Sequence, residues 1–80
     1  MTDLNDPLFI QAEIYLYSTR PELNSSNLRR VKVERQVVSG INFRIMYETL
    51  DGNKRYEVIV FRSLGGQYQL RQFNTMTLPF

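Results

Sequence analysis

Cysteine, histidine and tryptophan are all absent from this 80-residue chain. Without cysteine there is no disulfide scaffold, no thiol nucleophile and no thiolate ligand for zinc. Without histidine the chain lacks the commonest general base and the commonest metal ligand. We therefore expect a protein that is not an enzyme and that binds neither a metal nor a cofactor.

Long apolar runs are missing as well. No stretch approaches the roughly 20 consecutive apolar residues that a membrane-spanning helix needs. The first six residues, Met1 to Asp6, are mostly polar and acidic, which is unlike the apolar core of a secretory signal peptide. We expect a cytoplasmic protein that has no membrane partner.

The composition is that of a folded globular domain. Hydrophobic residues make up 42% of the chain and charged residues 22%. A chain of this length buries about 60–65% of its unfolded surface, so it supports one core. We expect a single domain over residues 1–80.

Positive charge is in slight excess, with ten Lys and Arg residues against eight Asp and Glu residues. The basic residues are spread along the chain, and no run of positive charge is longer than two residues. Mixed charges of this kind are typical of exposed strand faces rather than of a surface that binds nucleic acid. We therefore expect no nucleic-acid partner.

A helix is predicted from Leu8 to Tyr17. Asp6 followed by Pro7 is a start signal, because the Asp side chain caps free backbone N–H groups and Pro suits the first turn. Arg20-Pro21 ends the helix, since the residue before a proline is pushed out of the α region. Two sets of residues follow helical spacing: Phe9, Ala12 or Glu13, and Leu16 form one, and Ile10, Ile14 and Tyr17 form the other.

From Leu28 onward the apolar residues recur at every second position, which predicts β-strands. We expect three apolar residues to share one face of the first strand: Val31, Val33 and Val37. The alternation predicts strands over residues 28–38, 41–48, 55–64 and 68–73.

Turn residues separate these strands. Ser39-Gly40 interrupts the first alternation, Asp51-Gly52 is a strong hairpin signal, and Gly65-Gly66 reverses the chain once more. We expect an α+β fold in which one N-terminal helix packs across the apolar face of a four-stranded antiparallel sheet. The reason is that neither element can bury its apolar side alone.

Two carboxylates flank the Asp51-Gly52 turn and could be cross-strand neighbours, an arrangement that acid–base catalysis uses. They are Glu48 and Glu57. Because Lys54 and Arg55 lie beside them, we expect surface ion pairs instead.

The segment between the first two strands reads Gln36-Val37-Val38-Ser39-Gly40. It resembles the Gln-x-Val-x-Gly signature of the cystatins, which are protein inhibitors of papain-like cysteine proteases. The resemblance extends over about residues 8–75. Phe9 lies 27 residues before Gln36, close to the family spacing. Residues 24–33 and 69–73 look like plant cystatins, and residues 60–64 look like the cytosolic stefins.

The resemblance implies a cystatin-like fold and a reversible, competitive inhibitor of a papain-like cysteine protease. In that family an N-terminal segment and two hairpin tips enter the active-site cleft. Carried over to this chain, the protease contacts are Gln36, Val37, Val38, Ser39 and Gly40 at the first tip, Leu64, Gly65, Gly66 and Gln67 at the second, and Leu4 and Asn5 in the N-terminal segment.

The residue types suit these roles. Val37 and Val38 are β-branched, so they would supply apolar contact area with little loss of side-chain entropy. One of the two can lie in the core, because neighbouring residues of a strand point to opposite faces. Gly40 permits the positive φ and the close backbone approach that a tight turn needs. At the second tip, Leu64 is the only apolar anchor.

Three functional interpretations stay open at this point. The first is a cysteine-protease inhibitor, and the second is a cystatin-fold binding module without inhibition, because a fold does not fix a function. The third and weakest is a basic domain that binds nucleic acid. We expect a monomer or a domain-swapped dimer, since very few residues join the two long strands of the first hairpin.

Overall fold

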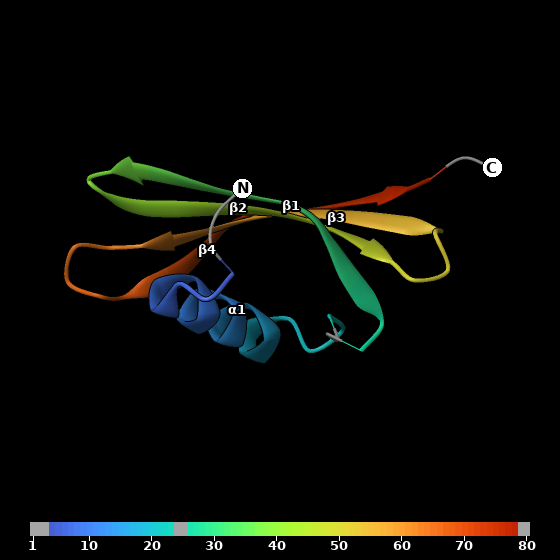
Figure 1. Ribbon diagram of the computed structural model, residues 1–80, viewed down its shortest axis with the longest axis horizontal. Coiled ribbons are helices and arrows are strands. Elements are labelled where there is room, and N and C mark those ends of the chain that lie inside the picture. The colour runs from blue at the N-terminus through green and yellow to red at the C-terminus, as the bar shows by residue number, and fades with distance from the viewer. Residues whose placement is uncertain (1–3, 24–25, 79–80) are drawn as a thin grey trace.

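The computed structural model of the chain describes residues 4–23 and 26–78. These residues form one helix and four strands: α1 (Pro7–Thr19), β1 (Leu28–Val38), β2 (Gly40–Thr49), β3 (Lys54–Arg62) and β4 (Tyr68–Thr77). The strands make one antiparallel sheet in the order β1-β2-β3-β4, and α1 lies across one of its faces (Figure 1). The predicted α+β architecture is confirmed.

Parts of two predictions lie outside the described residues. They are the two ends of the predicted domain, residues 1–3 and 79–80, and the first two residues of the segment 24–33 that looks like plant cystatins. Within the described ranges, no helix is long and apolar enough to cross a membrane.

Helix α1 begins and ends close to the predicted residues. The Asp6 carboxylate accepts a hydrogen bond from the backbone N–H of Leu8 at 2.9 Å, and Pro7 occupies the first turn. At the other end, the N–H of Arg20 donates to the carbonyl of Leu16 at 2.8 Å. The local signals for capping and for proline therefore determine both boundaries.

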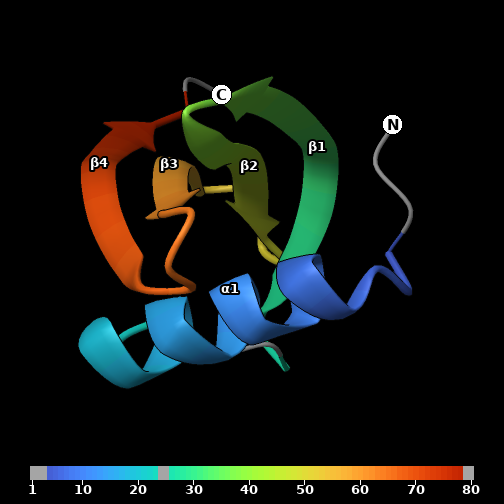
Figure 2. The ribbon, with the colours of Figure 1, turned by 90° about the vertical axis from the view of Figure 1, so that its left-hand side faces the viewer.

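The sheet curves around α1, so that its concave face holds the core (Figure 2). Two β-bulges accompany this curvature. One is in β1 between Arg30 and Lys32, and the other is in β4, where Arg71 is an extra residue with no pairing partner in β3. The first bulge takes Val31 out of alternation, and Val31 is exposed while Val33 is fully buried. The prediction that these two valines share a face is therefore wrong.

The core lies between α1 and the concave face of the sheet. Its buried apolar residues are Phe9, Ala12, Leu16, Leu23, Val33, Ile41, Phe43, Ile45, Tyr47, Val58 and Val60. Burying a large apolar side chain contributes about 1.5–3 kcal/mol, so this cluster is the main source of stability. Of the two sets with helical spacing, the one with Phe9 and Leu16 is buried, and it includes both Ala12 and Glu13. In the other set, Ile10 and Ile14 are exposed.

A buried ionic cluster joins α1 to β1 and β2. The Glu13 carboxylate, in a residue only 6% exposed, accepts hydrogen bonds from Arg30 Nε at 2.8 Å and Arg30 Nη2 at 2.5 Å. The Tyr47 hydroxyl donates to the same carboxylate at 2.7 Å. Burial raises the pKa of Tyr47, so its hydroxyl stays protonated and can donate. These contacts hold the helix against the sheet.

Candidate functional site

The β1–β2 and β3–β4 hairpins both reverse the chain at the same end of the sheet, on the left of Figure 1. The β2–β3 turn lies at the opposite end. We call residues 36–40 the first tip and residues 63–67 the second tip. Topology alone brings them together, because alternate turns of an antiparallel meander fall at the same end.

The first tip is very tight. Val37 pairs with Ile41 and Val38 pairs with Gly40, so Ser39 alone lies between the two strands. A turn of this kind leaves little freedom in the residues that flank it. The side chains at the tip are therefore held in place before any partner arrives.

Gly40 permits the backbone conformation and the close packing of this tip. It is buried, and its φ is +122°, a value that side chains other than glycine rarely allow. A Cβ atom at this position would lie 2.5 Å from the carbonyl oxygen of Arg62 and 2.7 Å from the ring of Phe61. The predicted positive φ and close approach are confirmed, and the close neighbours are the backbone and a ring of β3.

The valines of the first tip both face solvent. Val37 is 72% exposed and Val38 is 46% exposed, and Gln36 and Ser39 are exposed as well. The expectation that one valine lies in the core is therefore wrong. Strand alternation does send the two side chains to opposite faces of the sheet. Helix α1 covers only one of these faces, and the hairpin extends beyond the helix, so both side chains are exposed (Figure 1).

Ser63 closes the second tip. Its N–H donates to the carbonyl of Gln67 at 2.8 Å, and its hydroxyl accepts from the N–H of Gln67 at 3.1 Å. Gly66 has a φ of +86°, and its N–H donates to the carbonyl of Ser63. This turn presents Leu64 with 81% of its surface exposed, and Gly65 and Gln67 are exposed beside it.

The first turn of α1 is attached to both hairpins. The Asp6 carboxylate forms an ion pair with the guanidinium of Arg35, which directly precedes the first tip. The Tyr68 hydroxyl, directly after the second tip, donates to the carbonyl of Leu8 at 3.2 Å. The start of the helix therefore braces the two tips against each other.

The predicted N-terminal contacts, Leu4 and Asn5, precede this braced turn and are both exposed. Because Asp6 is held at Arg35 of β1, the chain enters the helix from the β1 side of the sheet (Figure 2). All three predicted segments thus belong to the same half of the molecule. Its exposed large apolar side chains include Leu4, Ile10, Val37, Val38 and Leu64.

Ion pairs dominate the opposite end of the sheet. The Glu48 carboxylate accepts from Arg55 at 2.6 Å and from Arg29 at 3.0 Å, and these bonds lower the pKa of Glu48, with Arg55 as the larger cause. The predicted ion pairs are confirmed for Glu48 and Arg55, whereas Glu57 and Lys54 take part in none of the ion pairs among the described residues. Glu57 pairs across the sheet with Met46, so the two carboxylates are not cross-strand partners.

The β2–β3 turn at this end is closed by its own polar groups. The Asp51 carboxylate accepts from the Thr49 hydroxyl at 2.6 Å and from the N–H of Asn53 at 2.9 Å, which lowers the pKa of Asp51. Gly52 has a φ of +77°. The predicted Asp-Gly hairpin is confirmed.

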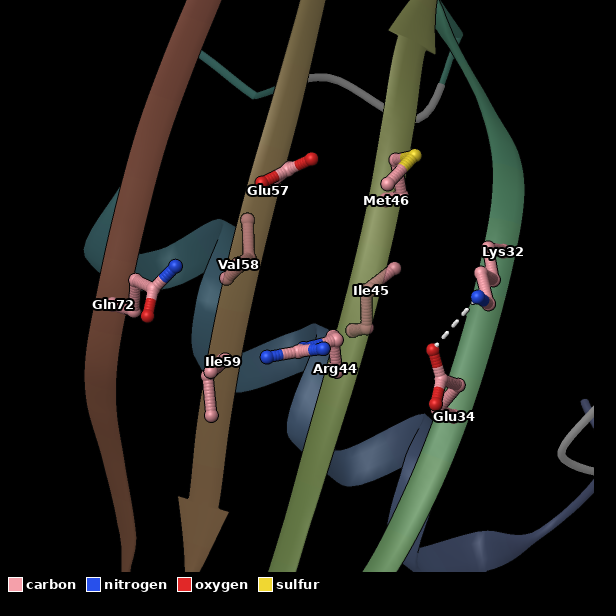
Figure 3. Close-up of a pocket in the computed structure, with 9 residues that line it drawn as sticks. All are labelled: Lys32, Glu34, Arg44, Ile45, Met46, Glu57, Val58, Ile59 and Gln72. Carbon is pink, nitrogen blue, oxygen red and sulfur yellow. Dashed lines mark ion pairs between the residues drawn. The ribbon is translucent and has the colours of Figure 1, made fainter.

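Two shallow hollows lie on the outer face of the sheet, the face turned away from α1. One has a volume of about 160 Å³ and is lined by the residues drawn in Figure 3. The other shares Glu34, Arg44 and Ile59 with it and reaches Gln36 of the first tip. In the part of the chain that the structure describes, no three acidic side chains gather as a metal site would require.

Comparisons with known proteins found no match for this chain, whether among protein-family models, curated proteins or solved structures.

Proposed function

We propose that this protein is a cystatin-like, reversible and competitive inhibitor of papain-like cysteine proteases. The observation that carries the proposal is the pair of tight hairpin tips at one end of the sheet, with Val37, Val38 and Leu64 exposed on them. Exposed apolar side chains gathered at one end of a small protein are a feature of binding surfaces. The motif of residues 36–40, which resembles the cystatin signature, lies at one of these tips.

The geometry of the tips suits blockade of a cleft. Both turns are short and internally bonded, so little conformational entropy would be lost when they bind. Val37 and Val38 have few rotamers to lose. A hairpin held this tightly cannot present an extended peptide bond to a protease nucleophile. It would therefore occupy the cleft without being cut.

Inhibition of this kind requires no chemistry from the chain. The tips would exclude the substrate by occupying its place, which makes the inhibition competitive and reversible. The bracing contacts of Asp6 with Arg35 and of Tyr68 with Leu8 support the proposal, because they hold both tips in a fixed relative position. A partner that contacts both tips together gains from this preorganisation.

The direct test is a titration of papain with the protein, read as the residual hydrolysis of a fluorogenic peptide. We expect competitive inhibition, with the protein recovered intact by mass spectrometry. Cleavage between Val38 and Ser39, or full papain activity at micromolar protein, would overturn the proposal. Binding without loss of activity would instead indicate a binding module that does not inhibit.

A matched pair of leucines sharpens this test. Leu64 is at the second tip, whereas Leu50 is 65% exposed in the β2–β3 turn at the opposite end. The change Leu64→Ser should weaken inhibition by about tenfold, because truncation of an anchoring side chain costs more than about 1 kcal/mol. Leu50→Ser should leave it unchanged. Equal effects of the two changes would contradict the assignment of the tips.

A further inference from the structure

Positive charge without an acidic partner surrounds the two tips. Six ion pairs join the described residues, and three arginines take part in none of them. We call Arg44, Arg62 and Arg71 the tip arginines. Lys54 is also outside these pairs, but it lies at the opposite end beside Asp51, whose pKa it helps to lower.

Arg71 lies between the tips on the outer face of the sheet. It is the extra residue of the β4 bulge, and its guanidinium stacks over the ring of Phe61 at 4.3 Å from the centroid. The same ring lies against Gly40 of the first tip. Stacking on a ring holds the guanidinium in place without neutralising its charge. Its Nε–H donates to the side-chain oxygen of Gln69 at 3.2 Å, and the remaining N–H donors of the guanidinium stay available to a partner.

Arg62 lies on the other face, directly before the second tip. Its Nη2 atom lies 3.4 Å from the position that a Cβ of Gly66 would take, and Nη1 donates to the carbonyl of Ser63 at 3.5 Å. Alternation along β3 turns Arg62 away from the face that carries Phe61. The tips thus have a cation on each side.

Arg44 extends the positive charge along the outer face. It stands across from Glu34 in the sheet, but Glu34 already forms an ion pair with Lys32 at 3.1 Å. Figure 3 shows Arg44 reaching from β2 toward β3, beside Ile59. Glu57 lines the same hollow, but it lies opposite Met46, farther from the tips, and no ion pair of the described residues joins it to Arg44.

We propose that the tip arginines select a papain-like protease whose cleft is bordered by carboxylates. This inference rests on the proposed function. When the tips enter a cleft, the two faces of the sheet approach its two rims, with Arg44 and Arg71 toward one rim and Arg62 toward the other. Guanidinium groups form strong, charge-assisted hydrogen bonds with carboxylates. A rim of the opposite sign would also accelerate the encounter.

The electrostatic contribution should appear mainly in the association rate. Long-range attraction steers the encounter and is screened by salt, whereas the apolar tips determine how slowly the complex dissociates. We expect the association rate constant to fall by about tenfold between low salt and about 0.3 M salt, and the dissociation rate constant to change little.

The test measures association by stopped flow with one protease in two forms. The first form has an acidic cleft rim, and in the second the rim carboxylates are replaced by their amides. The probe variant combines Arg44→Gln, Arg62→Gln and Arg71→Gln, and the control is Lys54→Gln, which removes one charge at the far end. If the triple variant does not fold, Arg44→Gln alone replaces it as the probe variant.

We expect faster association of the unmodified protein with the acidic form than with the amide form. The triple variant should lose about tenfold in association rate constant toward the acidic form, and Lys54→Gln should lose almost nothing. Equal rates with both forms, with inhibition intact, would overturn the selection by charge and leave the proposed function standing. Absence of binding to either form would overturn both proposals.

Discussion

At the end of the sheet that carries the β2–β3 turn, charged side chains hold the chain together. At the other end, exposed valines and a leucine sit on turns that depend on glycine geometry and backbone hydrogen bonds. The first end contains the contacts of Glu48 with Arg29 and Arg55, and nearby the buried Glu13 cluster. The second has Val37 and Leu64 largely exposed.

The contrast separates what stabilises this protein from what is available for binding. Buried and paired groups at one end contribute to the free energy of unfolding. The exposed apolar side chains at the tips contribute little, because they stay in contact with water when the chain folds. Substitution of an exposed tip side chain should therefore change binding, whereas substitution of a paired charge or of a tightly packed glycine should change the free energy of unfolding. Three changes test the second statement.

The largest loss of stability should follow Arg30→Met. This change leaves the buried Glu13 carboxylate without its cation, and breaking such a pair costs about 3–5 kcal/mol. Unfolding in urea should report most of this loss. The control is Lys32→Met, which removes the exposed partner of Glu34 and should cost less than about 1 kcal/mol. Similar losses in both variants would contradict a structural role for the cluster.

The next largest effect should come from Gly40→Ala at the first tip. The added methyl group meets the Arg62 carbonyl and the Phe61 ring, and the φ of +122° is strained for alanine. We expect a loss of about 2–3 kcal/mol in the free energy of unfolding.

Gly65→Ala provides the matched control at the second tip. Its φ lies outside the left-handed region, and the nearest atom to a new Cβ is the Ser63 hydroxyl at 3.8 Å. Because alanine restricts the unfolded chain, this change should be neutral or stabilise by up to about 1 kcal/mol. Equal losses of stability in the two variants would contradict the close contacts described for Gly40 at the first tip.

The smallest effect concerns pH and Glu48. Its pKa is lowered in the folded chain by Arg55 and Arg29. Its contribution to stability is therefore present above the ordinary pKa of a Glu carboxyl and is lost as the pH falls through the lower pKa of the folded chain. Glu48→Gln should lower the melting temperature slightly at neutral pH. The difference from the unmodified protein should shrink in acid. A difference that stays constant across this range would contradict the ion-pair account.

The fold could be predicted because its signals are local. Asp6-Pro7 and Arg20-Pro21 bound the helix through backbone sterics and capping, and Asp51-Gly52 determines a hairpin through positive φ. Alternation of apolar residues then assigned the core face of each strand. None of these inferences required knowledge of a distant contact.

The candidate site could be predicted only in part. The motif indicated the first tip, but the exposure of both valines depends on where α1 ends over the sheet, which no local pattern reports. The ion pair between Asp6 and Arg35 joins residues 29 positions apart and leaves no periodic signal. The bulge at Val31 could not be predicted either, because the alternation of apolar and polar residues is unbroken there in the sequence.

If the two tips form the binding surface, an NMR titration should locate the partner there. Isotope-labelled protein would be mixed with papain whose catalytic cysteine is replaced by alanine, so that binding occurs without cleavage. We predict that the amide signals of residues 36–40 and 64–67 shift or broaden together, while those of residues 48–55 stay unchanged. Changes confined to residues 48–55, or no changes at all, would contradict it.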